Sequence, residues 1–176
     1  MKTRIHHNKR ATWLLIALVA VAASVQAVNQ WNGEGDGMDW FDGANWSEGV
    51  PTADQEVSLA SGNVLLTNET PALTAFTMSG GTLTFSNWTT RLRADTVTVS
   101  GGTLTLPPAF TEQQMSNRVW IVCHDFTLDA GITINVDGCG YAPNNGLGKG
   151  TAGDTTGNGG GGYGGVGGKT GYGAAG

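Results

Sequence analysis

A ten-residue pattern occurs three times in the middle of the chain, and this internal repetition constrains the fold more than any other feature. The copies span residues 57–66, 76–85 and 97–106, and their shared glycines are Gly62, Gly81 and Gly102. A short repeat at a nearly constant spacing indicates one supersecondary unit that is stacked on copies of itself. We therefore expect a stacked architecture with an extended surface.

Within each copy, apolar and polar residues alternate, and the alternation keeps its phase across the glycine step. Alternation with a period of two is typical of strands with one buried face. The residues expected on that face are Val57, Leu59, Val64, Leu66, Phe76, Met78, Leu83, Phe85, Val97, Val99, Leu104 and Leu106. Four threonines, Thr77, Thr84, Thr98 and Thr105, would face the other way. A fourth, less regular copy covers residues 126–134, and we expect it to face the core through Phe126 and Leu128.

Two all-β folds satisfy this pattern. In a right-handed parallel β-helix, a solenoid of few rungs, each glycine pair marks a corner between two short strands. In an antiparallel β-hairpin sandwich, Gly80–Gly81 and Gly101–Gly102 are two-residue turns, and Met78 pairs with Leu83. The residues between successive copies are also strand-like, which favours the β-helix because its rungs use the whole period.

The chain divides into four segments. Residues 1–27 have the layout of a signal peptide: a basic start, an apolar run from Trp13 to Ala23, and small residues before a cut after Ala27. Residues 28–54 form a Trp/Gly/Asp-rich N-terminal cap, residues 55–137 carry the repeats, and residues 138–176 are a glycine-rich low-complexity segment in which we expect the sequence to be truncated. We therefore expect a secreted or cell-surface protein without a membrane span in its mature chain.

The net charge excludes one class of partner, and the two cysteines allow two alternatives. All fourteen acidic residues follow the signal and only five basic residues remain there, so the mature chain has a net charge of −9. Such a surface repels nucleic acid, which we exclude as a partner. Cys123 and Cys139 either form a disulfide in an oxidising compartment or remain two unpaired, buried thiols.

The aromatic and acidic residues of the N-terminal segment have two interpretations each. Trp31, Trp40 and Trp46 would either cap the apolar end of the stack or stack on sugar rings as a weak carbohydrate contact. The carboxylates of Asp36, Asp39 and Asp42 would either serve as solvated turn residues or hold Ca²⁺ weakly, although their spacing does not match the EF-hand.

No motif in the chain predicts catalysis or a cofactor. His124 lies between Cys123 and Asp125, and adjacent strand residues point to opposite faces, so these three cannot form a local triad. Arg91, Arg93 and Asp95 resemble the charged face of a lyase, but we interpret them as a solvated edge that limits aggregation. We therefore expect a protein that is not an enzyme.

The N-terminal motifs resemble a known class of protein. They are Trp31-Asn-Gly, Asp39-Trp-Phe-Asp42, Asn45-Trp-Ser47 and Val50-Pro-Thr-Ala-Asp54. Together with the Ser-Gly-Gly-Thr-Leu-Thr repeats, they are similar to the opening of bacterial secreted parallel β-helix surface proteins of the autotransporter-passenger-like and adhesin-like kind. The resemblance covers about residues 31–170. It implies a non-enzymatic structural or adhesin-like protein, the N-terminal part of a longer chain. The alternative is a carbohydrate-binding or polysaccharide-degrading β-helix protein whose active site is absent from this segment. Either way, the implied partner is a cell-envelope or extracellular polysaccharide.

Overall fold

The computed structural model describes residues 26–111, 117–142 and 145, and within them the protein is all-β apart from one short 3-10 helix. The signal peptide and most of the glycine-rich segment lie outside the described residues. The elements are β1 (Asn29–Gln30), the 3-10 helix η1 (Gly43–Asn45), β2 (Glu56–Leu59), β3 (Asn63–Leu66), β4 (Leu73–Phe85), β5 (Leu92–Thr105), β6 (Ile121–Val122), β7 (Asp125–Leu128) and β8 (Thr133–Ile134).

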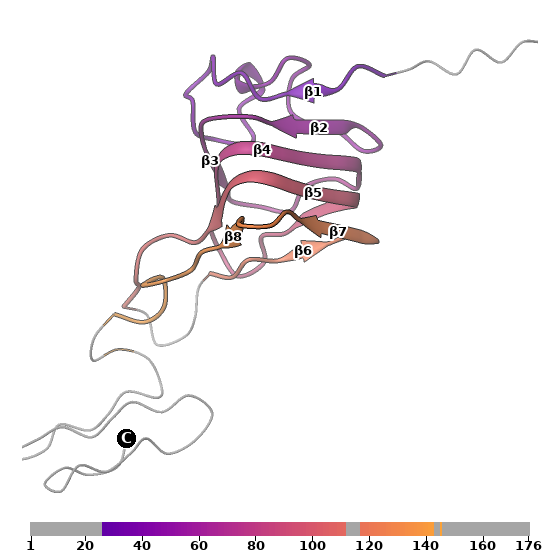
Figure 1. Ribbon diagram of the computed structural model, residues 1–176. Helices are drawn as coiled ribbons and strands as arrows, with labels where there is room; N and C mark the ends of the chain where they lie inside the picture. The colour runs from indigo at the N-terminus through magenta and orange to yellow at the C-terminus, as the bar shows by residue number, and fades with distance from the viewer. Residues whose placement is uncertain (1–25, 112–116, 143–144, 146–176) are drawn as a thin grey trace, which may run out of the picture.

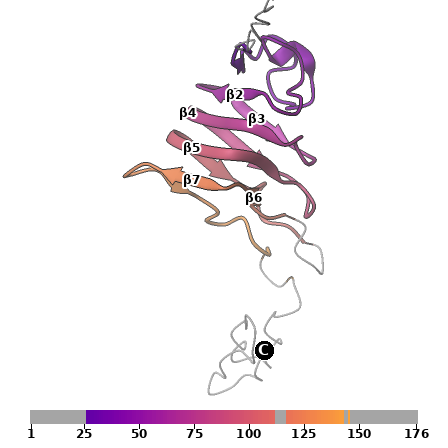
Figure 2. The ribbon, with the colours of Figure 1, turned by 90° about the vertical axis from the view of Figure 1, so that its right-hand side faces the viewer.

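Successive copies of the repeat lie beside one another in parallel. Strands β2 and β3 both pair with β4, β4 pairs with β5, and β5 pairs with β6, β7 and β8. Every pairing between these named strands is parallel. Figures 1 and 2 show β2, β4, β5 and β7 following one another down the molecule. The antiparallel hairpin alternative is therefore wrong, because Gly80–Gly81 lies inside the continuous strand β4 and does not reverse the chain.

The register brings equivalent residues of each copy together. Val57 pairs with Phe76, Phe76 with Val97, and Val97 with Phe126. The leucines follow the same rule, since Leu83 pairs with Leu104 and both are fully buried. The apolar residues predicted to face the core are buried in the first two copies and as far as Leu104 in the third. This burial confirms the predicted core face. Like side chains thus stack from copy to copy, and each contributes about 1.5–3 kcal/mol of burial.

The glycine step requires glycine because backbones meet there. Gly81 and Gly102 have φ angles of +80° and +87°, a conformation that L side chains rarely adopt. A Cβ at Gly81 would lie 2.6 Å from the carbonyl oxygen of Gly62, and one at Gly102 would lie 2.5 Å from that of Gly81. The repeated glycine therefore marks the place where one copy bends and rests directly on the copy before it.

The fourth copy departs from the predicted burial. Phe126 and Leu128 pair with Val97 and Val99 of β5, as their phase requires, but their side chains are 43% and 37% exposed. The expectation that they face a core is wrong, because among the described residues β7 pairs only with β5 and its other edge is open. Figure 2 shows β7 at the end of the stack.

An aromatic cluster of Trp31, Trp40 and Trp46, which we call the aromatic cap, covers the opposite end of the stack. Trp40 is fully buried, and its ring centroid lies 5.9 Å from that of Phe76 in β4. Trp46 packs edge-on against both Trp40 and Trp31, with centroids 4.7 and 5.0 Å apart. The loops that carry these indoles sit above β2 in Figure 1. Their apolar surface therefore covers the first copy of the repeat.

Candidate ligand-binding site

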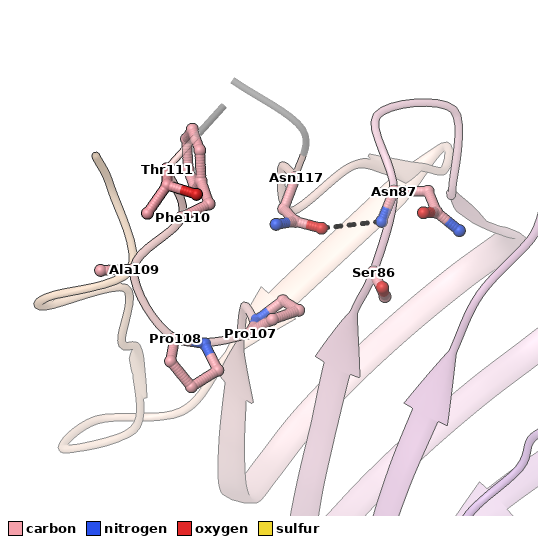
Figure 3. A pocket seen from close by; sticks show the side chains of 8 residues that line it. All are labelled: Ser86, Asn87, Pro107, Pro108, Ala109, Phe110, Thr111 and Asn117. Atoms are coloured by element: carbon pink, nitrogen blue, oxygen red, sulfur yellow. Dashed lines mark hydrogen bonds between the residues drawn. The ribbon is translucent and has the colours of Figure 1, made fainter. Parts of the chain in front are cut away.

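A pocket of about 440 Å³ opens where the loops that follow β4 and β5 approach each other. It is lined by Ser86, Asn87, Pro107, Pro108, Ala109, Phe110, Thr111 and Asn117. Figure 3 shows residues 107–111 along one side, Ser86 and Asn87 on the other, and Asn117 between them. The lining therefore combines amides and hydroxyls with an apolar wall, as in many small-ligand sites.

Hydrogen bonds hold the polar side of the pocket in place. The backbone N–H of Asn87 donates to Oδ1 of Asn117 at 2.8 Å, as drawn in Figure 3. The side-chain amide of Asn87 donates to the carbonyl of Thr67 at 2.9 Å, which ties the loop to the preceding copy. Asn87 has a φ angle of +82°, and asparagine tolerates this left-handed conformation better than most residues. The two amides are thus positioned by the stacking of the loops.

A cationic and aromatic surface begins beside the pocket, at the residues that follow Asn87 and Asn117. Arg118 donates from Nε to the carbonyl of Trp88 at 2.8 Å. Its guanidinium carbon lies 4.5 Å from the ring centroid of Trp88 and 3.7 Å from that of Trp120. The guanidinium of Arg91 lies 4.7 Å from the centroid of Trp120. Both arginines are therefore held in place by cation–π contacts.

One carboxylate joins two of the arginines. Glu69 forms ion pairs with Arg91 and with Arg93, the second at 2.8 Å. The hydrogen bond from Arg91 is the main reason that the pKa of Glu69 lies below its ordinary value, and Arg93 adds to the effect. We call the group Glu69, Trp88, Arg91, Arg93, Arg118 and Trp120 the arginine strip. At neutral pH it carries three positive charges and one negative charge.

The strip corrects part of the sequence interpretation. Arg91 and Arg93 were expected to form one charged edge with Asp95, but they pair with Glu69 instead. Asp95 lies 3.4 Å from Nδ1 of His124, and both side chains are mostly exposed. Glu69, Trp88, Arg118 and Trp120 were not among the residues predicted from the sequence. Extending the repeat register would have found Glu69 and Trp120, because residues 69–70 lie beside residues 91–93 and Leu92 pairs with Ile121.

The three indoles proposed for sugar stacking are not available for it. Trp31, Trp40 and Trp46 are 8%, 0% and 3% exposed, so their faces are covered by the protein. This burial corrects the carbohydrate-contact hypothesis at these positions, because a sugar ring needs an open aromatic face. The large exposed indole in the described part of the chain is Trp88, at 45%.

The three aspartates considered for Ca²⁺ cap backbone N–H groups. Asp36 Oδ1 accepts from the N–H of Met38 and of Asp39, both at 2.8 Å, and from the amide of Asn45. These hydrogen bonds hold the pKa of Asp36 below its ordinary value. Asp42 and Asp39 likewise accept backbone hydrogen bonds. No group of three or more acidic, histidine or cysteine side chains suited to a metal occurs among the described residues. These aspartates therefore organise turns, the first of the two interpretations given for them.

Cys123 and Cys139 are free thiols in the structure, as in the second of the two alternatives, although Cys123 is only partly buried. The thiol of Cys139 is buried and contacts the carbonyls of Leu106 and Asp137 at 3.5 and 3.6 Å. Cys123 packs against the core. Burial, together with the nearby Asp125, raises the pKa of the Cys123 thiol above its ordinary value. This thiol is therefore a weak nucleophile at neutral pH.

Comparison with protein-family models identifies the family of this chain. The family model for the G8 domain matches residues 45–137, more than half of the chain. The chain belongs to the G8 domain family. G8 domains are typical of extracellular proteins, which supports a secreted or cell-surface location. The match covers the four copies of the repeat and the last part of the aromatic cap. Neither the curated proteins nor the solved structures give a match. Within the described ranges, no helix is long and apolar enough to cross a membrane.

Proposed function

We propose that this G8 protein is a non-enzymatic, adhesin-like surface protein built as a right-handed parallel β-helix. The in-register, parallel stacking of equivalent residues is the observation that carries this proposal. Stacked repeats bury one continuous core and leave a long outer surface, which suits contact with an extended partner. The sequence resemblance to autotransporter-passenger-like and adhesin-like proteins points the same way.

A second candidate, carbohydrate binding, is favoured by the pocket. The pocket combines the side-chain amide of Asn117 and the hydroxyls of Ser86 and Thr111 with an apolar wall of prolines and Phe110. Sugars present hydroxyls at their rims and apolar C–H groups on their faces, so they complement such a lining. These side chains offer hydrogen bonds and no acid–base pair, so the chemistry suits binding. Both candidate functions are compatible with a surface protein that binds a cell-envelope or extracellular polysaccharide.

Export is tested first, with the full chain in a bacterial host. We expect the protein outside the cytoplasm and an N-terminus at Val28, because small residues precede the cut after Ala27. The variant Ala27→Arg removes the small residue at the cut and should remain uncleaved. N-terminal sequencing of each cell fraction gives the answer, and an intact cytoplasmic chain that begins at Met1 would contradict a secreted location.

Binding is tested with the exported chain and a panel of insoluble bacterial and plant polysaccharides. We expect the protein to co-sediment with at least one polysaccharide and to release no reducing sugar from it. Retention in the supernatant throughout the panel would refute polysaccharide binding. Release of reducing ends would refute the non-enzymatic assignment.

A further inference from the structure

The arginine strip is the basic region of an otherwise acidic protein. Arg91, Arg93 and Arg118 are the lysine and arginine residues of the part of the chain that the structure describes, and all three lie in the strip. The whole chain has a formal net charge of −5, and the mature chain is more acidic still. Within the described residues, an anion is therefore attracted to the strip and repelled by the surrounding acidic surface.

The charge of the strip is only partly neutralised from within. Glu69 is shared between Arg91 and Arg93, and no carboxylate within the described residues forms an ion pair with Arg118. The guanidinium of Arg118 is held between two indole rings, which fixes its plane without cancelling its charge. A guanidinium fixed in this way loses little freedom when it pairs with a ligand carboxylate or sulfate.

The strip is accessible, and two of its residues directly follow pocket residues in the chain. The side chain of Arg93 is 43% exposed and Trp88 is 45% exposed. Asn87 and Asn117 line the pocket, and the next residue of each segment, Trp88 and Arg118, belongs to the strip. A ligand that fills the pocket would therefore lie close to the exposed indole of Trp88 and to Arg118.

We propose that the pocket and the arginine strip together bind an acidic polysaccharide, whose carboxylate or sulfate groups pair with Arg118 and Arg93. The sugar hydroxyls would bond to Ser86 and Asn117, and a ring face would rest on the exposed Trp88. This proposal rests on the proposed polysaccharide-binding function and adds to it the class of polysaccharide and the residues that select it. Neutral polysaccharides lack the anionic groups that the arginines attract.

The test is affinity electrophoresis of the mature chain, residues 28–176, in gels that contain polygalacturonate, dextran sulfate or neutral dextran. We expect retardation by at least one acidic polymer, weakened by added salt, and none by dextran. Whether polygalacturonate or dextran sulfate retards the protein distinguishes a carboxylate ligand from a sulfate ligand. Equal retardation by dextran would overturn the acidic selectivity and leave polysaccharide binding intact. If no polymer of either test retards or sediments the protein, both proposals fail.

Matched variants locate the site. Arg93→Gln and Arg118→Gln should each weaken binding about tenfold, the effect of losing one charge-assisted hydrogen bond. Glu69→Gln removes the neutralising carboxylate and should strengthen binding, whereas Glu56→Gln makes the same change of net charge on β2 and should leave binding unaltered. Thermal melting confirms that each variant is folded. Equal effects of Glu69→Gln and Glu56→Gln in folded proteins would show that net charge, not the strip, controls binding, and would overturn the proposal.

Discussion

A single methyl group at Gly81 would meet the backbone of the preceding copy. We expect Gly81→Ala to destabilise the protein by about 2–5 kcal/mol. Alanine disfavours the left-handed backbone conformation at this position, and its Cβ would make a contact too short for a real Cβ. Gly131 occupies the same place in the last copy, with a φ angle of +85° and nothing within 4 Å of its Cβ position. Gly131→Ala should therefore lower the free energy of unfolding only through the disfavoured left-handed conformation, by about 1–2 kcal/mol. Urea unfolding compares the two, and equal losses would contradict close stacking at the glycine step.

Asp36 should make the N-terminal loops sensitive to acid. Its pKa is lower in the folded protein than in the unfolded chain, so it contributes stability at neutral pH that is lost as the pH falls below about 4. Asp36→Asn should lower the Tm at pH 7, and this difference should shrink as the pH falls below about 4 and through the lowered pKa of Asp36. Thermal melts of both proteins between pH 7 and pH 3 measure the effect. A difference that stays constant over this range would contradict a charged acceptor role.

At the scale of the element, Asn45 connects the loops that carry the aromatic cap. Its Oδ1 accepts from the N–H groups of Gly35 and Gly37 at 2.9 Å, and its Nδ2 donates to Asp36 and to the carbonyl of Asp39. Asn45 is fully buried, and Asn45→Ala removes all four of these hydrogen bonds and leaves the N–H groups of Gly35 and Gly37 without this acceptor.

We expect Asn45→Ala to cost about 2–4 kcal/mol in the free energy of unfolding, because four hydrogen bonds of one fully buried side chain are lost together. Asn32→Ala is the matched control, since Asn32 is exposed and its Oδ1 accepts from the N–H of Glu34. Chemical denaturation measures both variants. A loss at Asn45 no larger than that at Asn32 would show that the cap is not organised by this amide.

The elements differ in how far the sequence predicts them. Alternation across the glycine step predicts the buried faces of three copies because burial there depends on a period that the sequence displays. It does not predict the exposure of Phe126, which depends on whether another strand lies beyond β7. The arginine strip escapes prediction for a similar reason. Arg118 and Trp88 lie far apart in the chain, and they meet only because loops of successive copies stack.

At the scale of the whole molecule, the two ends of the stack are unlike. The aromatic cap closes one end, whereas β7 exposes Phe126 and Leu128 at the other. An open apolar edge strand is a site for association. We expect concentration-dependent association of the mature chain and expect Phe126→Lys to reduce it, with little change in Tm because this side chain is already largely exposed.

Thr127→Lys is the control for this association, because it adds the same charge to the same strand on its polar face. Sedimentation velocity at increasing protein concentration compares the two variants with the parent chain. If Thr127→Lys reduces association as much as Phe126→Lys, charge and not the apolar edge is responsible. A parent chain that stays monomeric throughout would contradict the expectation altogether.

Parallel, in-register stacking of the copies is tested most directly by cross-linking engineered cysteines in a Cys123→Ser/Cys139→Ser background. Thr77 pairs with Thr98 across β4 and β5. Neighbouring strands lie about 4.8 Å apart, within the range that a disulfide spans. Oxidation followed by mass spectrometry of peptides should join the cysteines of Thr77→Cys/Thr98→Cys and leave those of Thr77→Cys/Thr84→Cys reduced. A hairpin would place Thr77 opposite Thr84, so the reverse result would contradict the stacked architecture and the surface-protein function that depends on it.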